Sequence, residues 1–362
     1  MSVPPRRRVL FPVSTPLSLA VVEPLVRRLA ADPRLSLRVT SRHVGRAEVR
    51  SRLGPEVRTV PSWWAPYLRF DAAVCPGFFF HPRRRTPLVQ MFHGVSPKNY
   101  AARSEVERFD TLFVCGEYHR RKFVRAGVLA EDDPRGVRVG MPKTDRLVAG
   151  GEAFDAEVRA ARGPSDRPVV LYAPTRSGAA GSSLESFGLE VVERLVRGPA
   201  EVVVKLHDRS DRRYRRKLKV DYEAEIRRRA PGARVATTHD VVPFLAAADV
   251  LVTDLSSVAG EFMLLDRPIV FLSCPEHEER IRRAGAERFG DDDPHDLDWL
   301  RAAGEVADDA SAAEAAVERA LADPAERSAL RCERAELLFY HPGRATEVAA
   351  TALLGRIGLE ST

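Results

Sequence analysis

Short apolar runs alternate with amphipathic stretches along most of the chain, and this pattern limits the possible folds more than any other feature. In the first half, the apolar runs that predict strands are Arg8–Val13, Leu35–Val39, Asp71–Cys75, Pro87–Phe92 and Thr111–Cys115. The stretch between the first two runs has one apolar and one basic face, which predicts a helix over Leu17–Ala30. Strands that alternate with helices are typical of parallel α/β layers.

A second series of strands and helices follows a polar, glycine-containing stretch near residues 149–165. Its predicted strands are Pro168–Tyr172, Glu201–Leu206, Arg234–Ala236, Asp249–Thr253 and Pro268–Leu272, and its predicted helices are Leu184–Arg197, Tyr214–Arg229 and Val241–Ala248. Three closing helices are predicted over Ser311–Ala322, Pro324–Phe339 and Gly343–Ile357. A length of 362 residues also favours two domains. We therefore predict two α/β domains with parallel sheets, over residues 1–155 and 156–340.

Composition excludes several classes of protein. No apolar run reaches the roughly 18 residues that a membrane-spanning helix needs, and the basic N-terminus reads as the entry to a strand and not as a signal peptide. The four cysteines, Cys75, Cys115, Cys274 and Cys332, form no CxxC pair, which argues against a disulfide framework or a zinc site. We expect a cytoplasmic protein.

The net charge of +6 comes mainly from arginine, with runs at Arg6–Arg8, Arg83–Arg85 and Arg209–Lys219. One interpretation is an ordinary solvated surface, and the other is attraction to an anionic polymer or to an anionic membrane face. Aromatic residues make up 7% of the chain and are not interleaved with the basic runs as stacking platforms, so we do not expect nucleic-acid binding.

The strongest local signal is the segment Ala247–Phe271, in which a buried strand leads into Asp254, Ser256 and Ser257. Small hydroxyl residues at a helix start leave backbone N–H groups free for an anion. Glu261, one turn further on the same helix face, is placed to accept hydrogen bonds from ribose hydroxyls. The alternative is an ordinary helix cap followed by an exposed glutamate.

Two further predicted strands end in histidine. Lys205 and His207 follow an apolar run and are separated by one residue, so both are expected on the same side of that strand, where they suit a phosphate ligand. His93 and Gly94 follow a strand of the first domain, and histidine is well suited to acid–base work near neutral pH. A structural role for each histidine remains the alternative.

A third strand, Val169–Tyr172, leads into Thr175 and Arg176, which together make a plausible pyrophosphate contact; a plain turn with a solvated arginine is the alternative. At the exit of the first predicted domain, Asp145 and Arg146 follow a glycine and a proline. For these two residues we expect pairing or capping.

Five of these segments together resemble the CDP-glycerol glycerophosphotransferase family, the teichoic-acid primases and polymerases. They are FHGVSPK at Phe92–Lys98, GMPKTD at Gly140–Asp145, YAPTRS at Tyr172–Ser177, VKLHD at Val204–Asp208 and ADVLVTDLSSVAGEF at Ala248–Phe262, in the order that the family has. The resemblance implies a GT-B fold, with two Rossmann-like, doubly wound domains and a cleft between them. The first domain is then on the acceptor side, the second binds the nucleotide donor, and residues 341–362 pack back toward the first domain. Leu255 and Gly260–Glu261 depart from the family pattern, so glycerol, ribitol or sugar stay open as the group carried by the donor.

The resemblance also implies a reaction, in which an acceptor hydroxyl attacks the β-phosphorus of CDP-glycerol and CMP leaves. His93 and His207 are then the catalytic candidates. The donor-binding candidates are Gly94, Thr175, Arg176, Lys205, Asp254, Ser256, Ser257 and Glu261. No carboxylate cluster is built for Mg²⁺, so no cofactor is predicted and metal dependence stays open. The expected partners are a glycan or lipid-linked acceptor and the inner face of an anionic membrane, contacted through the arginine-rich segments.

Two other functions remain open at this point. A GT-B glycosyltransferase or epimerase-like enzyme with a UDP donor would use the same phosphate-binding helix and ribose carboxylate. A non-catalytic nucleotide-binding relative would keep the fold without turnover, although the presence of both His93 and His207 argues against it.

Overall fold

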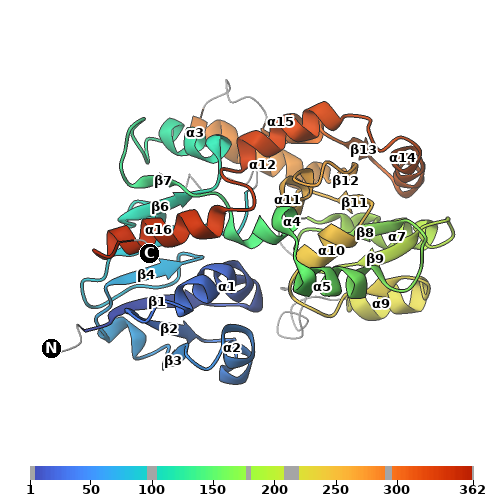
Figure 1. Ribbon diagram of the computed structural model, residues 1–362. Coiled ribbons are helices and arrows are strands. Elements are labelled where there is room, and N and C mark those ends of the chain that lie inside the picture. The colour runs from blue at the N-terminus through green and yellow to red at the C-terminus, as the bar shows by residue number, and fades with distance from the viewer. Residues whose placement is uncertain (1–4, 96–103, 177–180, 208–219, 290–295, 361–362) are drawn as a thin grey trace. The chain divides into compact units, whose positions relative to one another are not determined.

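The computed structural model describes residues 5–95, 104–176, 181–207, 220–289 and 296–360. The chain forms two compact units (Figure 1). The first unit combines Met1–Gly94 and Tyr100–Asp145 with the C-terminal Leu337–Thr362, and the second combines Val95–Asn99 with Arg146–Glu336. The first unit is therefore built from both ends of the chain.

The sheet of the first unit has seven parallel strands in the order β3-β2-β1-β4-β5-β6-β7. The strands are β1 (Arg7–Val13), β2 (Leu35–Ser41), β3 (Arg58–Pro61), β4 (Ala72–Cys75), β5 (Leu88–Met91), β6 (Thr111–Val114) and β7 (Gly136–Arg138). The central strands β4, β5 and β6 are buried along their whole length, which explains why they read as continuous apolar runs.

Helices α1 (Pro16–Ala30), α2 (Arg46–Leu53) and α16 (Ala345–Arg356) contribute to one apolar core with this sheet. Helix α1 begins at a capping box, in which the Thr15 hydroxyl accepts from the Ser18 N–H and the Ser18 hydroxyl accepts from the Thr15 N–H. Although α1 and α16 are far apart in sequence, they pack side by side (Figure 1). Helix α3 (Glu117–Arg125) follows β6, and the 3₁₀ turn η1 (Ala65–Tyr67) follows β3.

The second unit has a six-stranded parallel sheet in the order β10-β9-β8-β11-β12-β13. Its strands are β8 (Val169–Tyr172), β9 (Glu201–Val204), β10 (Arg234–Val235), β11 (Val250–Thr253), β12 (Ile269–Leu272) and β13 (Glu305–Ala307). Helices α7 (Gly188–Leu195), α9 (Tyr222–Arg229) and α14 (Ala310–Ala322) bury Val191, Ile226 and Val317 in one core with the sheet.

The remaining helices are shorter or lie between these elements. They are α4 (Asp145–Ala149), α5 (Glu152–Arg162), α6 (Ser183–Ser186), α10 (Val242–Ala247), α11 (Val258–Met263), α12 (Pro275–Phe289), α13 (Asp296–Arg301) and α15 (Ser328–Leu338). In the part of the chain that the structure describes, no helix is both long and apolar enough to cross a membrane.

All ten strands predicted from the sequence are confirmed, and within the described residues three further strands, β3, β7 and β13, were missed. The predicted helix over residues 184–197 is wrong as one element, because the chain breaks at Phe187 into α6 and α7. Of the helix predicted over residues 214–229, the part from Tyr222 is confirmed and residues 214–219 lie outside the described residues.

Candidate active site

The order of each sheet reverses at one place, between β1 and β4 in the first unit and between β8 and β11 in the second. In open α/β sheets, ligands bind beyond the carboxyl ends of the strands at such a switch point. In the second unit, Thr175 follows β8 and Asp254 follows β11, so two of the predicted donor-binding residues emerge at this switch point. They are in direct contact, since the Thr175 N–H donates to Asp254 Oδ1 at 2.7 Å.

Asp254 is the centre of a buried hydrogen-bond network. Its second oxygen, Oδ2, accepts from the Ser183 N–H at 3.0 Å, from the Ser183 hydroxyl at 2.9 Å and from the Ser182 hydroxyl at 3.2 Å. The side chain is 1% exposed. The carboxylate therefore joins the end of β11 to the loop after β8 and to the start of α6, and it faces the protein instead of solvent.

Sequence reasoning missed Ser182 and Ser183 as members of this site. Ser182 caps α6, and the Ser183 hydroxyl also pairs with the Tyr172 hydroxyl at 2.9 Å. Burial raises the pKa of Tyr172, so this phenol stays protonated. The available signal was the SSLE sequence before an apolar-periodic stretch, because serine followed by glutamate is typical of a helix N-terminus.

Ser256 and Ser257 form the corner between β11 and α11. The Ser256 N–H donates to the Asp254 carbonyl at 2.9 Å, and Ser257 occupies the N-cap of α11 without a capping hydrogen bond from its side chain. Both serines are half-buried, so neither lies in the packed interior. Because α11 has only six residues, a phosphate here would depend on hydroxyl and N–H donors more than on a long helix dipole.

Glu261 lies at the first turn of α11, where its N–H donates to the Ser257 carbonyl at 3.3 Å. The alternative of an exposed glutamate is wrong, because Glu261 is 0% exposed. A ribose hydroxyl reaches this carboxylate only if neighbouring residues move aside.

Lys205 and His207 lie just beyond β9, which ends at Val204. The expectation that their side chains share one side of a strand is therefore unsupported, since alternation holds only within the strand. Lys205 is buried and its ammonium group donates to the Leu206 carbonyl at 2.9 Å. His207 and Arg176 are half-buried.

His93 follows β5 in the first unit and is half-buried, with the buried Gly94 directly after it. His93 Nδ1 lies 3.1 Å from the Pro76 carbonyl oxygen. A carbonyl can only accept, so this contact places a proton on Nδ1 and leaves the lone pair of the neutral ring on Nε2. That tautomer is the one that a general base requires.

The residue before His93 is held by an aromatic cluster. The Phe92 ring lies 4.5 Å from the His119 ring and 5.4 Å from the Phe123 ring. Burial and the nearby Lys122 lower the pKa of His119 to about 3, so its ring is neutral near pH 7. His119 therefore acts as a packed aromatic side chain that supports the strand end carrying His93.

The predicted site residues are divided between the two units. His93 and Gly94 belong to the first unit, whereas His207 and the other candidates belong to the second. Within the second unit, the structure shows Thr175 and Asp254 in direct contact and Ser256 hydrogen-bonded to the Asp254 backbone. A cleft that brings His93 and His207 together stays a prediction.

Asp145 has the capping role that we expected. Its carboxylate accepts from the Ala345 N–H at 3.0 Å and from the Thr346 N–H at 2.7 Å, at the start of α16. Arg146 pairs with Glu157 and Asp240. The segment at residues 140–145 thus fastens the C-terminal helix to the first unit.

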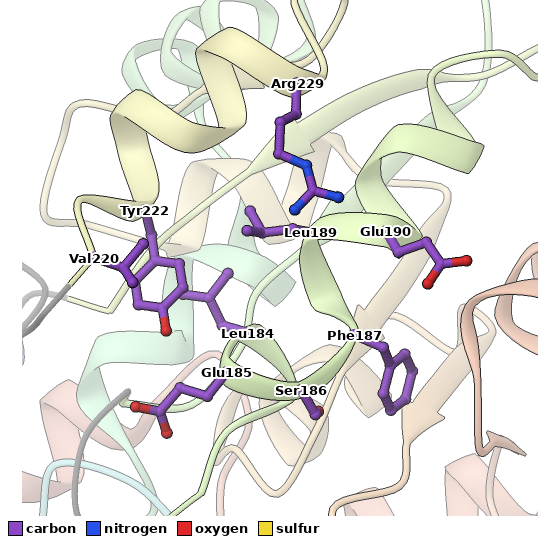
Figure 2. A pocket seen from close by; sticks show the side chains of 9 residues that line it. All are labelled: Leu184, Glu185, Ser186, Phe187, Leu189, Glu190, Val220, Tyr222 and Arg229. Atoms are coloured by element: carbon purple, nitrogen blue, oxygen red, sulfur yellow. The ribbon is translucent and has the colours of Figure 1, made fainter.

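A pocket of about 250 Å³ opens on the second unit beside α6, α7 and α9 (Figure 2). Its lining residues are Leu184, Glu185, Ser186, Phe187, Leu189, Glu190, Val220, Tyr222 and Arg229. None of the predicted site residues lines it, and Arg229 is already paired with Glu193. We assign no ligand to this pocket.

The last two sequence-based expectations concern the densest arginine run and metal binding. The densest arginine run, Arg209–Lys219, falls wholly within residues 208–219, outside the described residues. Across the described residues, no group of three or more His, Cys, Asp or Glu side chains is arranged to hold a metal ion.

Solved structures with the same fold include the wall teichoic acid polymerase TagF. One TagF structure, soaked with CDPG, is 16% identical, with a TM-score of 0.65 over 98% of this chain and 90% of that chain. A UDP-N-acetylglucosamine 2-epimerase is 13% identical, with a TM-score of 0.59 over 99% of each chain, and the Staphylococcus aureus protein MnaA with UDP has the same identity and TM-score. These likenesses confirm the predicted GT-B fold class.

Sequence comparison identifies the family. A teichoic acid glycerol-phosphate primase of Bacillus spizizenii is 28% identical over 139 residues, which is 37% of this chain and 33% of the primase, so the match spans about a third of that relative. The model of the CDP-Glycerol:Poly(glycerophosphate) glycerophosphotransferase family matches residues 64–279, a range that contains every candidate site residue from His93 to Glu261. The chain therefore belongs to the CDP-Glycerol:Poly(glycerophosphate) glycerophosphotransferase family.

Proposed function

We propose that this protein transfers a glycerol-phosphate unit, or a related polyol-phosphate unit, from a CDP-activated donor to a hydroxyl of a cell-wall or capsular glycan, with release of CMP. The observation that carries the proposal is the family match over residues 64–279, which contains all the candidate site residues. The direct contact of Thr175 with Asp254 at the switch point of the second sheet supports a ligand site there.

The proposed reaction is a single displacement at phosphorus. The acceptor oxygen forms a bond to the β-phosphorus as the bond from that phosphorus to the bridging oxygen breaks, and CMP carries the electron pair away. His93 Nε2 takes the proton of the attacking hydroxyl, because the Pro76 carbonyl holds the other ring nitrogen protonated. Phosphoryl transfer otherwise depends on positioning and charge stabilisation.

The donor phosphates need cationic groups and hydrogen-bond donors. We assign this role to Arg176, Lys205 and His207, with the hydroxyls of Ser256 and Ser257. Gly94 allows the backbone to come close to the ligand, and Thr175 contributes its hydroxyl. Glu261 is the proposed ribose contact once its neighbours move. Asp254 supports the donor site from inside, because its oxygens accept from Thr175, Ser182 and Ser183.

The test of the catalytic role is CMP release from CDP-glycerol by the full chain and by His93→Gln, with a glycan acceptor present. Loss of a general base lowers the rate roughly 10²–10⁴-fold. His43→Gln removes an exposed imidazole of the same unit and should leave the rate unchanged. Equal turnover by His93→Gln and His43→Gln would remove His93 from the mechanism.

A thermal-shift series with CDP-glycerol, CDP-ribitol and a UDP-sugar tests the donor class. We expect stabilisation by the CDP-alcohols, because a ligand that binds only the folded state raises the melting temperature. A shift with the UDP-sugar alone would favour the glycosyltransferase or epimerase-like alternative. A shift with CDP-glycerol but no transfer to any acceptor would favour the non-catalytic relative.

We further propose a cytoplasmic location at the inner face of an anionic membrane, where a lipid-linked acceptor would be available. The arginine runs Arg6–Arg8 and Arg83–Arg85 motivate this part of the proposal, since anionic leaflets attract clustered basic residues.

A further inference from the structure

The first unit exposes a row of large aromatic side chains. Trp63 is 72% exposed, Trp64 47% and Tyr67 51%, on the segment that runs from β3 through η1. The Trp63 and Trp64 ring centroids lie 5.7 Å apart, and those of Trp64 and Tyr67 lie 5.9 Å apart. Single exposed apolar residues are ordinary, but a contiguous exposed group marks an interaction site.

An arginine run is fastened to this row. The Arg83 N–H donates to the Pro66 carbonyl in η1 at 2.7 Å, and Arg83, Arg84 and Arg85 are all exposed. Phe79, 44% exposed, lies on the same connecting segment between β4 and β5. We call Trp63, Trp64, Tyr67, Phe79 and Arg83–Arg85 the aromatic–arginine face.

The face carries positive charge without carboxylates of its own. From Val57 to Val95 the single carboxylate in the sequence is Asp71, and it pairs with Arg7 at 3.0 Å. Positive groups are also crowded on the neighbouring strands. Burial lowers the pKa of Arg38 on β2, and the charges of Arg58 and Arg8 lower it further.

The segment that bears Phe79 and the arginines is held in place. The Arg108 guanidinium donates to the Phe78 carbonyl at 2.7 Å and to the Phe80 carbonyl at 2.6 Å. At its beginning, the Pro76 carbonyl contacts His93 Nδ1. The face is therefore preformed and continuous with the chain that positions the candidate base.

We propose that the aromatic–arginine face docks on the headgroup region of an anionic membrane. Tryptophan and tyrosine prefer the membrane–water interface, where the ring is half in apolar surroundings and half in water. Arginines beside them meet the lipid phosphates. A soluble anionic polymer would use the arginines but would gain little from a row of exposed indole rings.

This proposal names the surface through which the protein would bind the membrane proposed above. Only the biological reason for the binding, access to a lipid-linked acceptor, rests on the proposed function. Docking through this face would hold His93 close to the membrane surface, because one short segment links the two. Vesicle binding is measured without donor or acceptor, so failure of docking and failure of the transferase proposal are separate results.

The experiment measures sedimentation of the full chain with phosphatidylcholine vesicles, with and without phosphatidylglycerol, and follows tryptophan emission. Trp63 and Trp64 are two of the three tryptophans, so their insertion should shift the emission to the blue only with the anionic vesicles. Arg84→Ala/Arg85→Ala should weaken binding roughly 30-fold, because each arginine near such a surface contributes about a fivefold factor. Trp63→Ser/Trp64→Ser should abolish the shift and weaken sedimentation.

The matched control is Arg121→Ala/Arg283→Ala, which removes the same charge from positions 68% and 70% exposed outside the face. It should bind anionic vesicles like the unchanged chain. Equal binding to neutral vesicles, or equal loss in the control and in Arg84→Ala/Arg85→Ala, would overturn the proposal. Binding to soluble poly(glycerol phosphate) with no binding to vesicles would also overturn it, and would assign the face to an anionic polymer.

Discussion

Buried carboxylates hold the loops that carry the candidate site. Asp254 accepts at least four hydrogen bonds from Thr175, Ser182 and Ser183 while it is almost fully excluded from solvent. Such a charge is stable inside a protein only while its partners remain, because a buried donor or acceptor left without one costs about 1–3 kcal/mol. Asp254 therefore ties the fold of the second unit to the shape of the proposed donor site.

Replacing Asp254 by asparagine should affect stability and donor binding together. The amide nitrogen cannot accept, so Asp254→Asn should lower the free energy of unfolding by about 1–3 kcal/mol in urea denaturation. It should also weaken stabilisation by CDP-glycerol more than it changes CMP release at saturating donor, since Asp254 does not touch the reacting atoms. Asp298→Asn, at a side chain 55% exposed, is the control and should stay within about 0.5 kcal/mol. Unchanged unfolding of Asp254→Asn would contradict this role.

For single residues, the sequence identified candidate positions of the site more successfully than it identified the contacts that each side chain makes. Asp254 was identified from its place after a buried strand, but nothing in the pattern tells whether such a carboxylate faces a ligand or the protein. The partners Ser182 and Ser183 come from a loop 71 to 72 positions away, a contact that only the fold creates. The ligand roles of His93, His207 and the other candidates stay predictions.

Most strands that are buried on both faces were predictable, and of the half-buried edge strands only β10 (Arg234–Val235) was predicted. The three missed strands, β3, β7 and β13, all lie at sheet edges. Their burial is partial, so their sequences lack the apolar run that marks a central strand. The break between α6 and α7 could not be predicted from the sequence either, because the apolar pattern continues through Phe187.

The junction between β7 and α16 depends on a glycine whose role the sequence did not reveal. Gly140 has a φ of +93°, and a Cβ there would lie 2.0 Å from the Tyr340 carbonyl oxygen. Gly140→Ala should therefore cost backbone strain of about 1–2 kcal/mol and a further cost from the clash, measured as the shift of the urea midpoint.

Gly150→Ala is a matched control for this prediction. Gly150 also has a positive φ, of +64°, but a Cβ there would meet nothing within 4 Å. It should show the backbone strain alone, so the difference between the two variants isolates the clash. Equal destabilisation by the two substitutions would show that the close approach of Tyr340 does not matter.

The whole molecule consists of two units with separate apolar cores. Helix α16 contributes Ala349, Ala350, Leu353 and Leu354 to the core of the first unit, together with β1, β2 and α1. The core around α7, α9 and α14 belongs to the second unit. The alternating pattern predicted two such domains, and the sequence-based expectation that residues 341–362 pack toward the first rested on fold resemblance.

Damage to one core should therefore leave the other intact. Leu353→Ala should destabilise the first unit by about 2–5 kcal/mol, because it opens a cavity in a fully buried site. In hydrogen–deuterium exchange, peptides from β1 and β2 should lose protection while peptides from β8 and β11 keep it. Val317→Ala in the second core should give the reverse pattern. Equal loss across both units in either variant would show that they unfold as one.

The placement of α16 has a consequence for biosynthesis. Strand β1 is translated before the second unit, yet helix α16, which completes the same apolar core, is translated only after the whole of the second unit. A nascent chain thus carries an unfinished sheet throughout that interval, while the second unit, almost entirely contiguous, is free to fold. We expect chaperone dependence during translation to concentrate on the first unit and to end when α16 emerges.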